Sequence, residues 1–110
     1  MAATFQLQRD AENLYFFNLL DSSGDTLLVS GLYEAKTDAE EAIKAVRVGT
    51  LMSTQIAAGK TPKGESFFVV KNTGGQILVK SQLFSSQMLF DNALHQVKDN
   101  ACVAQITDLT

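Results

Sequence analysis

The alternation of apolar and polar residues along the chain predicts short strands joined by tight turns. Seven segments combine β-branched, aromatic or large apolar side chains with flanking turn residues. They span residues 3–8, 14–20, 26–33, about 51–58, 67–71, 77–84 and about 101–107. Polar and glycine residues between the second and third segments, and again between the fifth and sixth, indicate two hairpins.

Two further segments repeat apolar residues at the helical spacing i, i+3, i+4 and i+7. These residues are Ala39, Ala42, Ile43 and Val46 in the first segment, and Phe90, Ala93, Leu94 and Val97 in the second. Thr37 followed by Glu40 predicts a capping box at the start of the first helix, and Gly49 can end it. The second helix lacks that box, so we expect Ser85 or Ser86 to cap it.

The chain also matches itself without a gap when it is shifted by 51 residues. Segment 16–50 then falls on 67–101 with 8 identities in 35 positions, against about 2 expected from average composition. We interpret this match as a tandem duplication of a β3-α-β unit. We expect an α+β fold in which one antiparallel sheet carries both helices on one face. Residues 1–110 would form a single domain of two repeats, about 1–53 and 54–110.

Three segments of the first repeat carry a resemblance to a known family. They are residues 15–19 (YFFNL), 24–33 (GDTLLVSGLY) and 38–47 (DAEEAIKAVR). This pattern resembles the YegP-like family of small bacterial proteins of unknown function (domain of unknown function 1508). The resemblance implies two β3-α-β units that join into one sheet and exchange their C-terminal strands. It implies no activity and supplies no catalytic residues.

Composition and charge exclude several functional classes. The 110 residues include 9 Lys or Arg and 12 Asp or Glu, for a net charge of −3, so we expect no nucleic-acid partner. A single cysteine cannot form an intramolecular disulfide. The first residues lack the pattern of a signal peptide, and apolar runs do not exceed four residues. We therefore expect a cytoplasmic protein without membrane contact.

No group of residues forms a convincing catalytic or metal-binding pattern. The single histidine, His95, is expected to be solvated on the outer face of the second helix, and Cys102 to be a small buried side chain at a strand start. Glu40 and Glu41 are typical of a solvated helix face. Gly59-Lys60-Thr61 resembles the end of a P-loop, but Thr54 replaces the required glycine. We expect no catalytic site, cofactor or metal.

Strand alternation predicts which side chains lie on each face of the sheet. The pairs expected beneath the helices are Phe17/Phe68, Leu19/Val70, Leu28/Val79 and Leu32/Leu83. The pairs expected on the opposite face are Phe16/Phe67, Leu27/Leu78 and Tyr33/Phe84. This second face is either an exposed stripe for contact with a protein or ligand, or a surface shielded by strand twist and long side chains such as Lys80.

Met88 and Leu89 stand where the first repeat has Thr37 and Asp38. Two apolar side chains at a helix N-terminus run against the preference of the dipole for acidic residues. They are candidates for contact with a partner or for burial against residues 84–86. The leading function is a small interaction or structural protein, monomeric and not an enzyme. The alternative is a small-molecule binder that uses the aromatic face of the sheet or the seam between the repeats.

Overall fold

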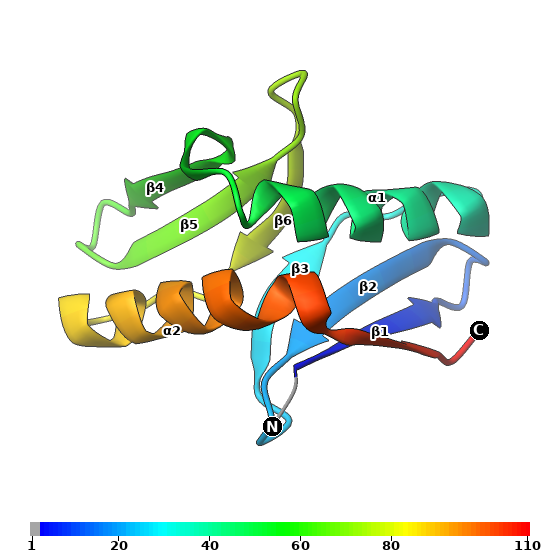
Figure 1. The fold of residues 1–110 in the computed structure, drawn as a ribbon, viewed down its shortest axis with the longest axis horizontal. Helices are drawn as coiled ribbons and strands as arrows, with labels where there is room; N and C mark the ends of the chain where they lie inside the picture. The colour runs from blue at the N-terminus through cyan, green and yellow to red at the C-terminus, as the bar shows by residue number, and fades with distance from the viewer. Residues whose placement is uncertain (1–2) are drawn as a thin grey trace.

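The computed structural model describes residues 3–110, which form one twisted sheet with both helices on the same face (Figure 1). The strands are β1 (Thr4–Arg9), β2 (Tyr15–Leu20), β3 (Thr26–Ser30), β4 (Ile56–Lys60), β5 (Ser66–Lys71), β6 (Ile77–Ser81) and β7 (Gln105–Asp108). The helices are α1 (Lys36–Gly49) and α2 (Gln87–Asn100), with short 3-10 turns η1 (Ser53–Gln55) and η2 (Ala101–Val103). The α+β class is thereby confirmed.

The strands lie in the order β4-β5-β6-β3-β2-β1-β7. β1 and β7 pair in parallel, whereas the other neighbouring strands pair antiparallel. The prediction of a purely antiparallel sheet is therefore wrong. The reason is the path of the chain, because α2 carries it across the sheet and β7 then runs alongside β1 in the same direction.

Both predicted hairpins are present, with side chains that stabilise their turns. Asp21 accepts bonds from the backbone N–H groups of Ser23 and Asp25, at 2.8 and 3.0 Å. Gly24 adopts a φ of 88°, a left-handed conformation that favours glycine. In the second hairpin Asn72 accepts the corresponding two bonds, at 2.9 and 3.0 Å.

The centre of the sheet relates the two halves by an approximate two-fold rotation. Val29 pairs with Lys80 in the β3–β6 ladder, and these residues are equivalent under the shift of 51. The flanking pairs Leu28–Ser81 and Ser30–Val79 exchange with each other under the same shift. The first-half elements β1, β2, β3 and α1 correspond under this shift to β4, β5, β6 and α2.

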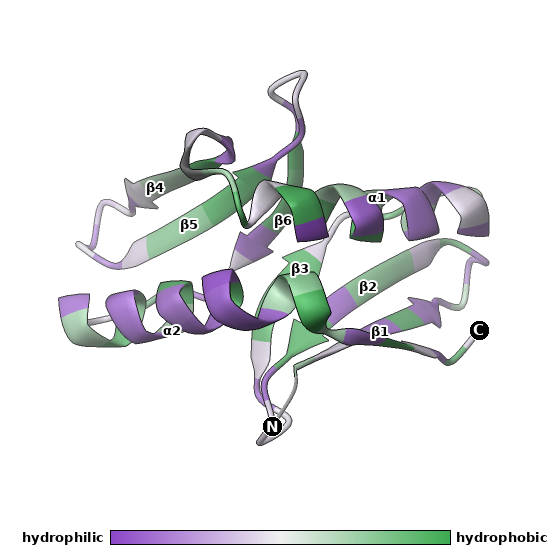
Figure 2. Ribbon diagram, viewed as in Figure 1, coloured by the Kyte–Doolittle hydropathy of each residue, from purple (hydrophilic) through white to green (hydrophobic). Residues whose placement is uncertain are grey.

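The main core lies between the sheet and the two helices. Its fully buried large side chains include Phe5, Phe17, Phe68, Leu19, Val70, Leu28, Val79, Ile43, Val46 and Val97. Figure 2 shows hydrophobic residues along β2 and β5, and hydrophilic residues over much of both helices. Three of the four pairs expected beneath the helices are thus confirmed.

Leu32 and Leu83 are exposed, so the fourth predicted pair is wrong. β3 and β6 end at Ser30 and Ser81, three residues earlier than expected. The Ser30 hydroxyl donates to the carbonyl of Gly31 and accepts a bond from the N–H of Phe17, both at 2.8 Å. Strand alternation stops there, so the position of the next leucine cannot be extrapolated from it.

The helix caps differ from the prediction at one of the two starts. Ala35 is the N-cap of α1 and makes no side-chain cap bond, while Thr37 lies inside the helix, so the predicted capping box is wrong. Ser86 caps α2 as predicted, because its hydroxyl accepts a bond from the Leu89 N–H at 3.2 Å. α1 ends at Gly49, also as predicted.

Candidate functional site

Tyr33 and Phe84 lie on the helix side of the sheet rather than on the opposite face. Tyr33 stacks on Phe17 with ring centroids 6.3 Å apart, and Phe84 stacks on Phe68 at 6.4 Å. Phe84 also meets Phe90 of α2 edge-on, at 6.2 Å. Their predicted placement is wrong because the irregular residues after β3 and β6 reset the alternation.

Leu27 and Leu78 are buried members of the main core, so their predicted placement on the opposite face is also wrong. The β2–β3 register shifts between Leu19 and Leu20, and the β5–β6 register shifts at the equivalent place. A register shift inserts an extra residue and breaks strict alternation. Leu27 falls at this irregularity, between the pairs Leu19–Leu28 and Leu20–Thr26.

Phe16 and Phe67 are half-buried and lie outside the main core cluster. The Phe67 ring covers Gly59 on the neighbouring strand, where an added Cβ would lie 2.8 Å from the ring Cζ atom. The Lys80 ammonium lies 4.8 Å from the centroid of the same ring. Of the two alternatives for this face, the contacts of Phe67 favour shielding.

Met88 and Leu89, in the first turn of α2, are 68% and 48% exposed. Of the two alternatives for this pair, burial against residues 84–86 is therefore wrong. Exposed large apolar side chains scattered singly are common, whereas Met88 and Leu89 form an adjacent exposed pair in the first turn of α2.

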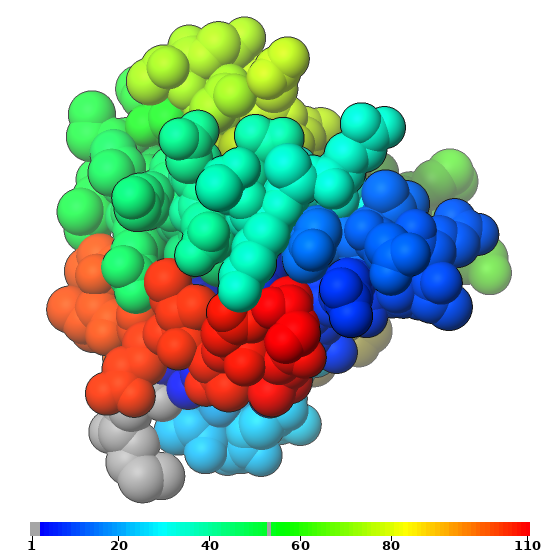
Figure 3. Space-filling view, turned by 90° about the vertical axis from the view of Figure 1, so that its right-hand side faces the viewer, coloured from blue at the N-terminus to red at the C-terminus, as the bar shows by residue number. Residues whose placement is uncertain are grey.

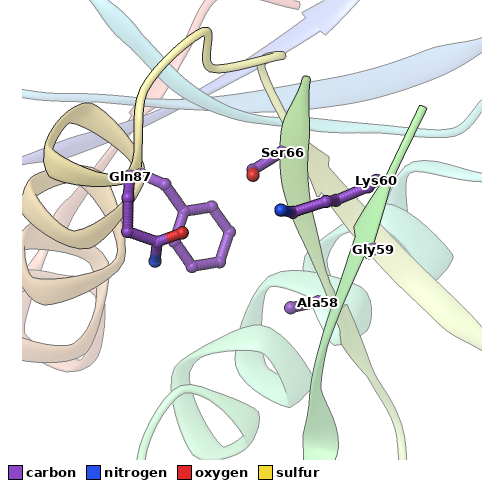
Figure 4. A pocket seen from close by; sticks show the side chains of 6 residues that line it. Ala58, Gly59, Lys60, Ser66 and Gln87 are labelled. Carbon is purple, nitrogen blue, oxygen red and sulfur yellow. The ribbon is translucent and has the colours of Figure 1, made fainter. Parts of the chain in front are cut away.

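A cavity of about 290 Å³ lies between β4 and the start of α2 (Figure 4). Its lining residues are Ala58, Gly59, Lys60, Ser66, Gln87 and Phe90. Figure 4 shows the Lys60 amino group and the Gln87 amide directed toward the same space, with Ser66 beside it. The Gln87 amide donates to Asp91 at 2.9 Å, whereas Lys60 has no ion-pair partner within residues 3–110.

The equivalent place in the first half is filled by the C-terminal segment of the chain. Asp108 of β7 lies opposite Leu7 of β1, and its carboxylate pairs with the Lys36 ammonium at the start of α1. The next residue, Leu109, donates its N–H to the Leu7 carbonyl at 2.8 Å. Figure 3 shows this segment, in red, packed against α1. Under the shift of 51, Leu7 corresponds to Ala58 and Lys36 to Gln87.

The remaining candidate residues do not assemble into a chemical site. His95 is exposed as predicted and pairs with Asp99 on its own helix at 3.0 Å. Cys102 is half-buried in η2, not buried at a strand start as predicted. The described part of the chain holds no group of three or more His, Cys, Asp or Glu side chains placed to share a metal ion. Nor does any helix there have the length and apolar character needed to cross a membrane.

Strand alternation does not indicate the cavity, because the cavity is lined by a strand edge and a helix start. A signal was nevertheless present in the self-match. The self-match aligns Gln87 with Lys36 and β4 with β1, the first strand of a repeat. β4 also follows the first helix, as β7 follows the second, but one strand cannot pair with β5 and also lie at its own outer edge. Among the residues that the structure describes, the strand that would correspond to β7 is therefore missing beside β4.

Comparisons with known proteins place the chain in a family. The family model described as domain of unknown function (DUF1508) matches residues 10–49. The chain is 32% identical to UPF0339 protein PA0329 of Pseudomonas aeruginosa over 98% of both chains, and 29% identical to UPF0339 protein YegP of Escherichia coli K12 over the full length of both.

Two solution NMR structures match the fold over 100% of this chain. UPF0339 protein SO3888 from Shewanella oneidensis matches with a TM-score of 0.95 at 27% identity, over 93% of that chain. The Escherichia coli protein yegP, described as of unknown function, matches with a TM-score of 0.92 at 29% identity, over 95% of that chain. The chain therefore belongs to the UPF0339 family of YegP-like proteins, for which these relatives carry no assigned function.

Proposed function

We propose that the chain is a non-enzymatic interaction protein that binds another protein through β4 and the start of α2. We call this region the β4–α2 surface and define it by Ala58, Lys60, Gln87, Met88, Leu89 and Phe90. The observation that carries the proposal is a cavity whose counterpart in the first half is filled, with the exposed pair Met88 and Leu89 in the same helical turn as its lining residues Gln87 and Phe90. A partner that extends from the cavity around the first turn of α2 would cover both apolar side chains.

The residue types at this surface suit binding better than catalysis. A lysine and a serine line the cavity, with no histidine or carboxylate among the lining residues to act as their base. The net charge of −3 gives no support to a nucleic-acid partner.

We also infer that the two halves arose by tandem duplication of one unit. The shift of 51 that aligns the sequence also aligns two hydrogen bonds from backbone N–H groups to serine hydroxyls, from Phe17 to Ser30 and from Phe68 to Ser81.

Because both halves of the sheet lie in one chain, we propose that the protein is a monomer. A cytoplasmic location remains our proposal, supported by the single cysteine.

Affinity capture from a host lysate with matched variants tests the proposed surface. In the test variant, Met88→Thr and Leu89→Asp restore the residues of the first repeat. In the control variant, Leu51→Thr and Met52→Asp change an adjacent pair with nearly the same exposure, 63% and 49%. We expect a partner that the wild type and the control recover but the test variant does not.

Equal recovery by the two variants would contradict the proposed surface. Melting temperatures keep the comparison interpretable, because exposed positions contribute little to stability and both variants should melt close to the wild type. A large loss of stability in the test variant alone would show that Met88 and Leu89 act in folding instead.

A second candidate function rests on another cavity, at the seam between the halves. Val29, Gly31, Ile77 and Leu78 are among the residues that line about 360 Å³ beside the β3–β6 ladder. This seam could hold a small molecule. A thermal-shift screen against metabolites tests this function, because a ligand at 100 times its Kd stabilises the protein by about 2.7 kcal/mol. A screen without any shift would contradict it.

A further inference from the structure

We propose that the outer edge of β4 binds an extended segment of a partner protein that runs parallel to β4 and places a carboxylate at Lys60. This inference rests on the proposed function for the location of the contact and adds its geometry and the chemistry of the partner. Pairing of an added strand with an exposed sheet edge is an established mode of peptide recognition.

The first half of the molecule shows how such a strand lies. β7 runs parallel to β1 with Phe5 opposite Ile106 and Leu7 opposite Asp108. The Leu7 carbonyl accepts the Leu109 N–H, so the backbone groups of Leu7, and by alternation those of Phe5, face β7. Their counterparts in the second half are Ile56 and Ala58.

β4 offers these backbone groups at a free edge. β4 is the last strand at its end of the sheet, and within residues 3–110 no strand lies beyond it. Backbone groups of an edge strand alternate between the neighbouring strand and the outside. By correspondence with β1, Ala57 and Gly59 bond to β5, whereas the N–H and C=O groups of Ile56 and Ala58 point outward.

The cavity supplies the preference for a carboxylate. In the first half, the Asp108 carboxylate opposite Leu7 reaches the Lys36 ammonium. The corresponding partner residue would lie opposite Ala58, at the cavity toward which the Lys60 amino group points (Figure 4). Gln87 replaces Lys36 there, so Lys60 is the cation available to pair with the carboxylate.

A second copy of this chain is a weaker candidate for the occupant. Its β7 already pairs with its own β1 and contributes the Lys36–Asp108 ion pair. Moving β7 to a neighbouring β4 would break as many strand bonds as it forms, and association would add an entropic cost. A segment that is not already paired in a sheet gains these bonds without that loss.

The test titrates the isotope-labelled full chain with a synthetic peptide and follows backbone amide signals by NMR. The peptide has the sequence of residues 103–110 (VAQITDLT). Its N-terminus is acetylated and its C-terminus amidated, so the aspartate side chain is the one carboxylate in the peptide. We expect saturable binding with shifts at Ile56–Lys60, Ser66 and Gln87. Replacing the peptide aspartate with asparagine should weaken binding about two- to fivefold, as for a solvated ion pair.

Two protein variants test the geometry. Ala58→Pro removes an outward N–H while leaving the β4–β5 bonds, a change that edge strands accept. It should weaken peptide binding about five- to tenfold, the range of one lost hydrogen bond. Lys60→Gln should weaken binding about two- to fivefold, whereas the matched control Lys63→Gln, in the exposed turn after β4, should not change it.

Three results would overturn the inference. In the first, the peptide does not bind at millimolar concentration. In the second, the shifts are confined to β1 because the peptide displaces the chain's own β7. In the third, the wild type, Ala58→Pro and Lys60→Gln bind the peptide equally. Concentration-dependent shifts at Ile56 and Ala58 without peptide would assign this edge to a second copy and would also overturn it. If capture still depends on Met88 and Leu89 while the peptide fails, only this inference falls and the proposed function stands.

Discussion

The glycine at the end of α1 lets the helix approach the sheet closely. An added Cβ at Gly49 would lie 2.8 Å from Val70 Cγ1 and 3.3 Å from the carbonyl oxygen of Lys71. Val70 is fully buried, so it cannot move away without disturbing the core. The sequence indicates Gly49 as a helix end, but not this contact, because a close approach depends on residues distant along the chain.

We therefore predict that Gly49→Ala lowers the free energy of unfolding by about 1–3 kcal/mol, as overpacking does in dense cores. Gly31→Ala is the matched control, because nothing lies within 4 Å of its added Cβ and its φ is not left-handed. Denaturant unfolding of both variants measures the difference. Similar stability of the two variants would contradict the packing at Gly49.

In each half, a serine hydroxyl instead of a backbone carbonyl accepts a strand N–H: Ser30 in the first half and Ser81 in the second. Ser81 is the buried one of the two. Its hydroxyl accepts the Phe68 N–H at 2.9 Å and donates to the Gln82 carbonyl. Ser81→Ala leaves a buried N–H without its partner, so we predict a loss of about 1–3 kcal/mol in the free energy of unfolding. The exposed control Ser85→Ala should change it by less than about 0.5 kcal/mol. Equal effects would refute the role of the Ser81 hydroxyl.

Whole elements were predictable wherever periodicity extended over several residues. The two hairpins and both helices follow from alternation and helical spacing, since Phe17, Leu19, Ile43 and Val46 all occupy their expected core positions. Irregularities were not predictable, because the register shift beside Leu27 and the early strand end at Ser30 depend on bonds between strands. The same limitation concealed the cavity, whose lining combines a strand edge with a helix start.

At the scale of a single strand, the ion pair between Asp108 and Lys36 makes the docking of β7 pH-dependent. The hydrogen bond from Lys36, together with bonds from the Thr110 hydroxyl and N–H, lowers the pKa of Asp108 from 3.8 to about 2. A lowered carboxyl pKa means that this stabilisation is present above about pH 3.8 and is lost as the pH falls toward 2. The bond also raises the pKa of Lys36, so its contribution fades only in strongly alkaline solution.

We predict that the β7 amides exchange faster with solvent as the pH falls from 4 to 2, after correction for intrinsic exchange rates. Asp108→Asn removes the titrating carboxylate, so the variant should lack this acceleration. Amide exchange of Thr107 and Leu109, whose N–H groups face β1, is measured by NMR in both proteins and provides the comparison. The same pH dependence in the variant would contradict the proposed effect of Asp108.

At the scale of the whole molecule, neither half supplies a complete sheet. Residues 1–53 would leave β3 without β6 and β1 without β7. Exposed strand edges and one uncovered core face favour unfolding or self-association. We predict that the isolated 1–53 fragment is either unfolded or dimeric, which circular dichroism and analytical ultracentrifugation can establish. A monomeric fragment with cooperative unfolding would contradict this dependence between the halves.

β7 covers the outer edge of β1, whereas the equivalent edge of β4 is free within residues 3–110. Hydrogen exchange of backbone amides in the intact chain distinguishes a covered edge from a free one. We predict slow exchange at Phe5 and Leu7 beneath β7, slow exchange at Ala57 and Gly59 facing β5, and fast exchange at Ile56 and Ala58. Protection of Ile56 and Ala58 equal to that of Phe5 and Leu7 would contradict this difference between the two edges, because it would mean that the β4 edge is already covered.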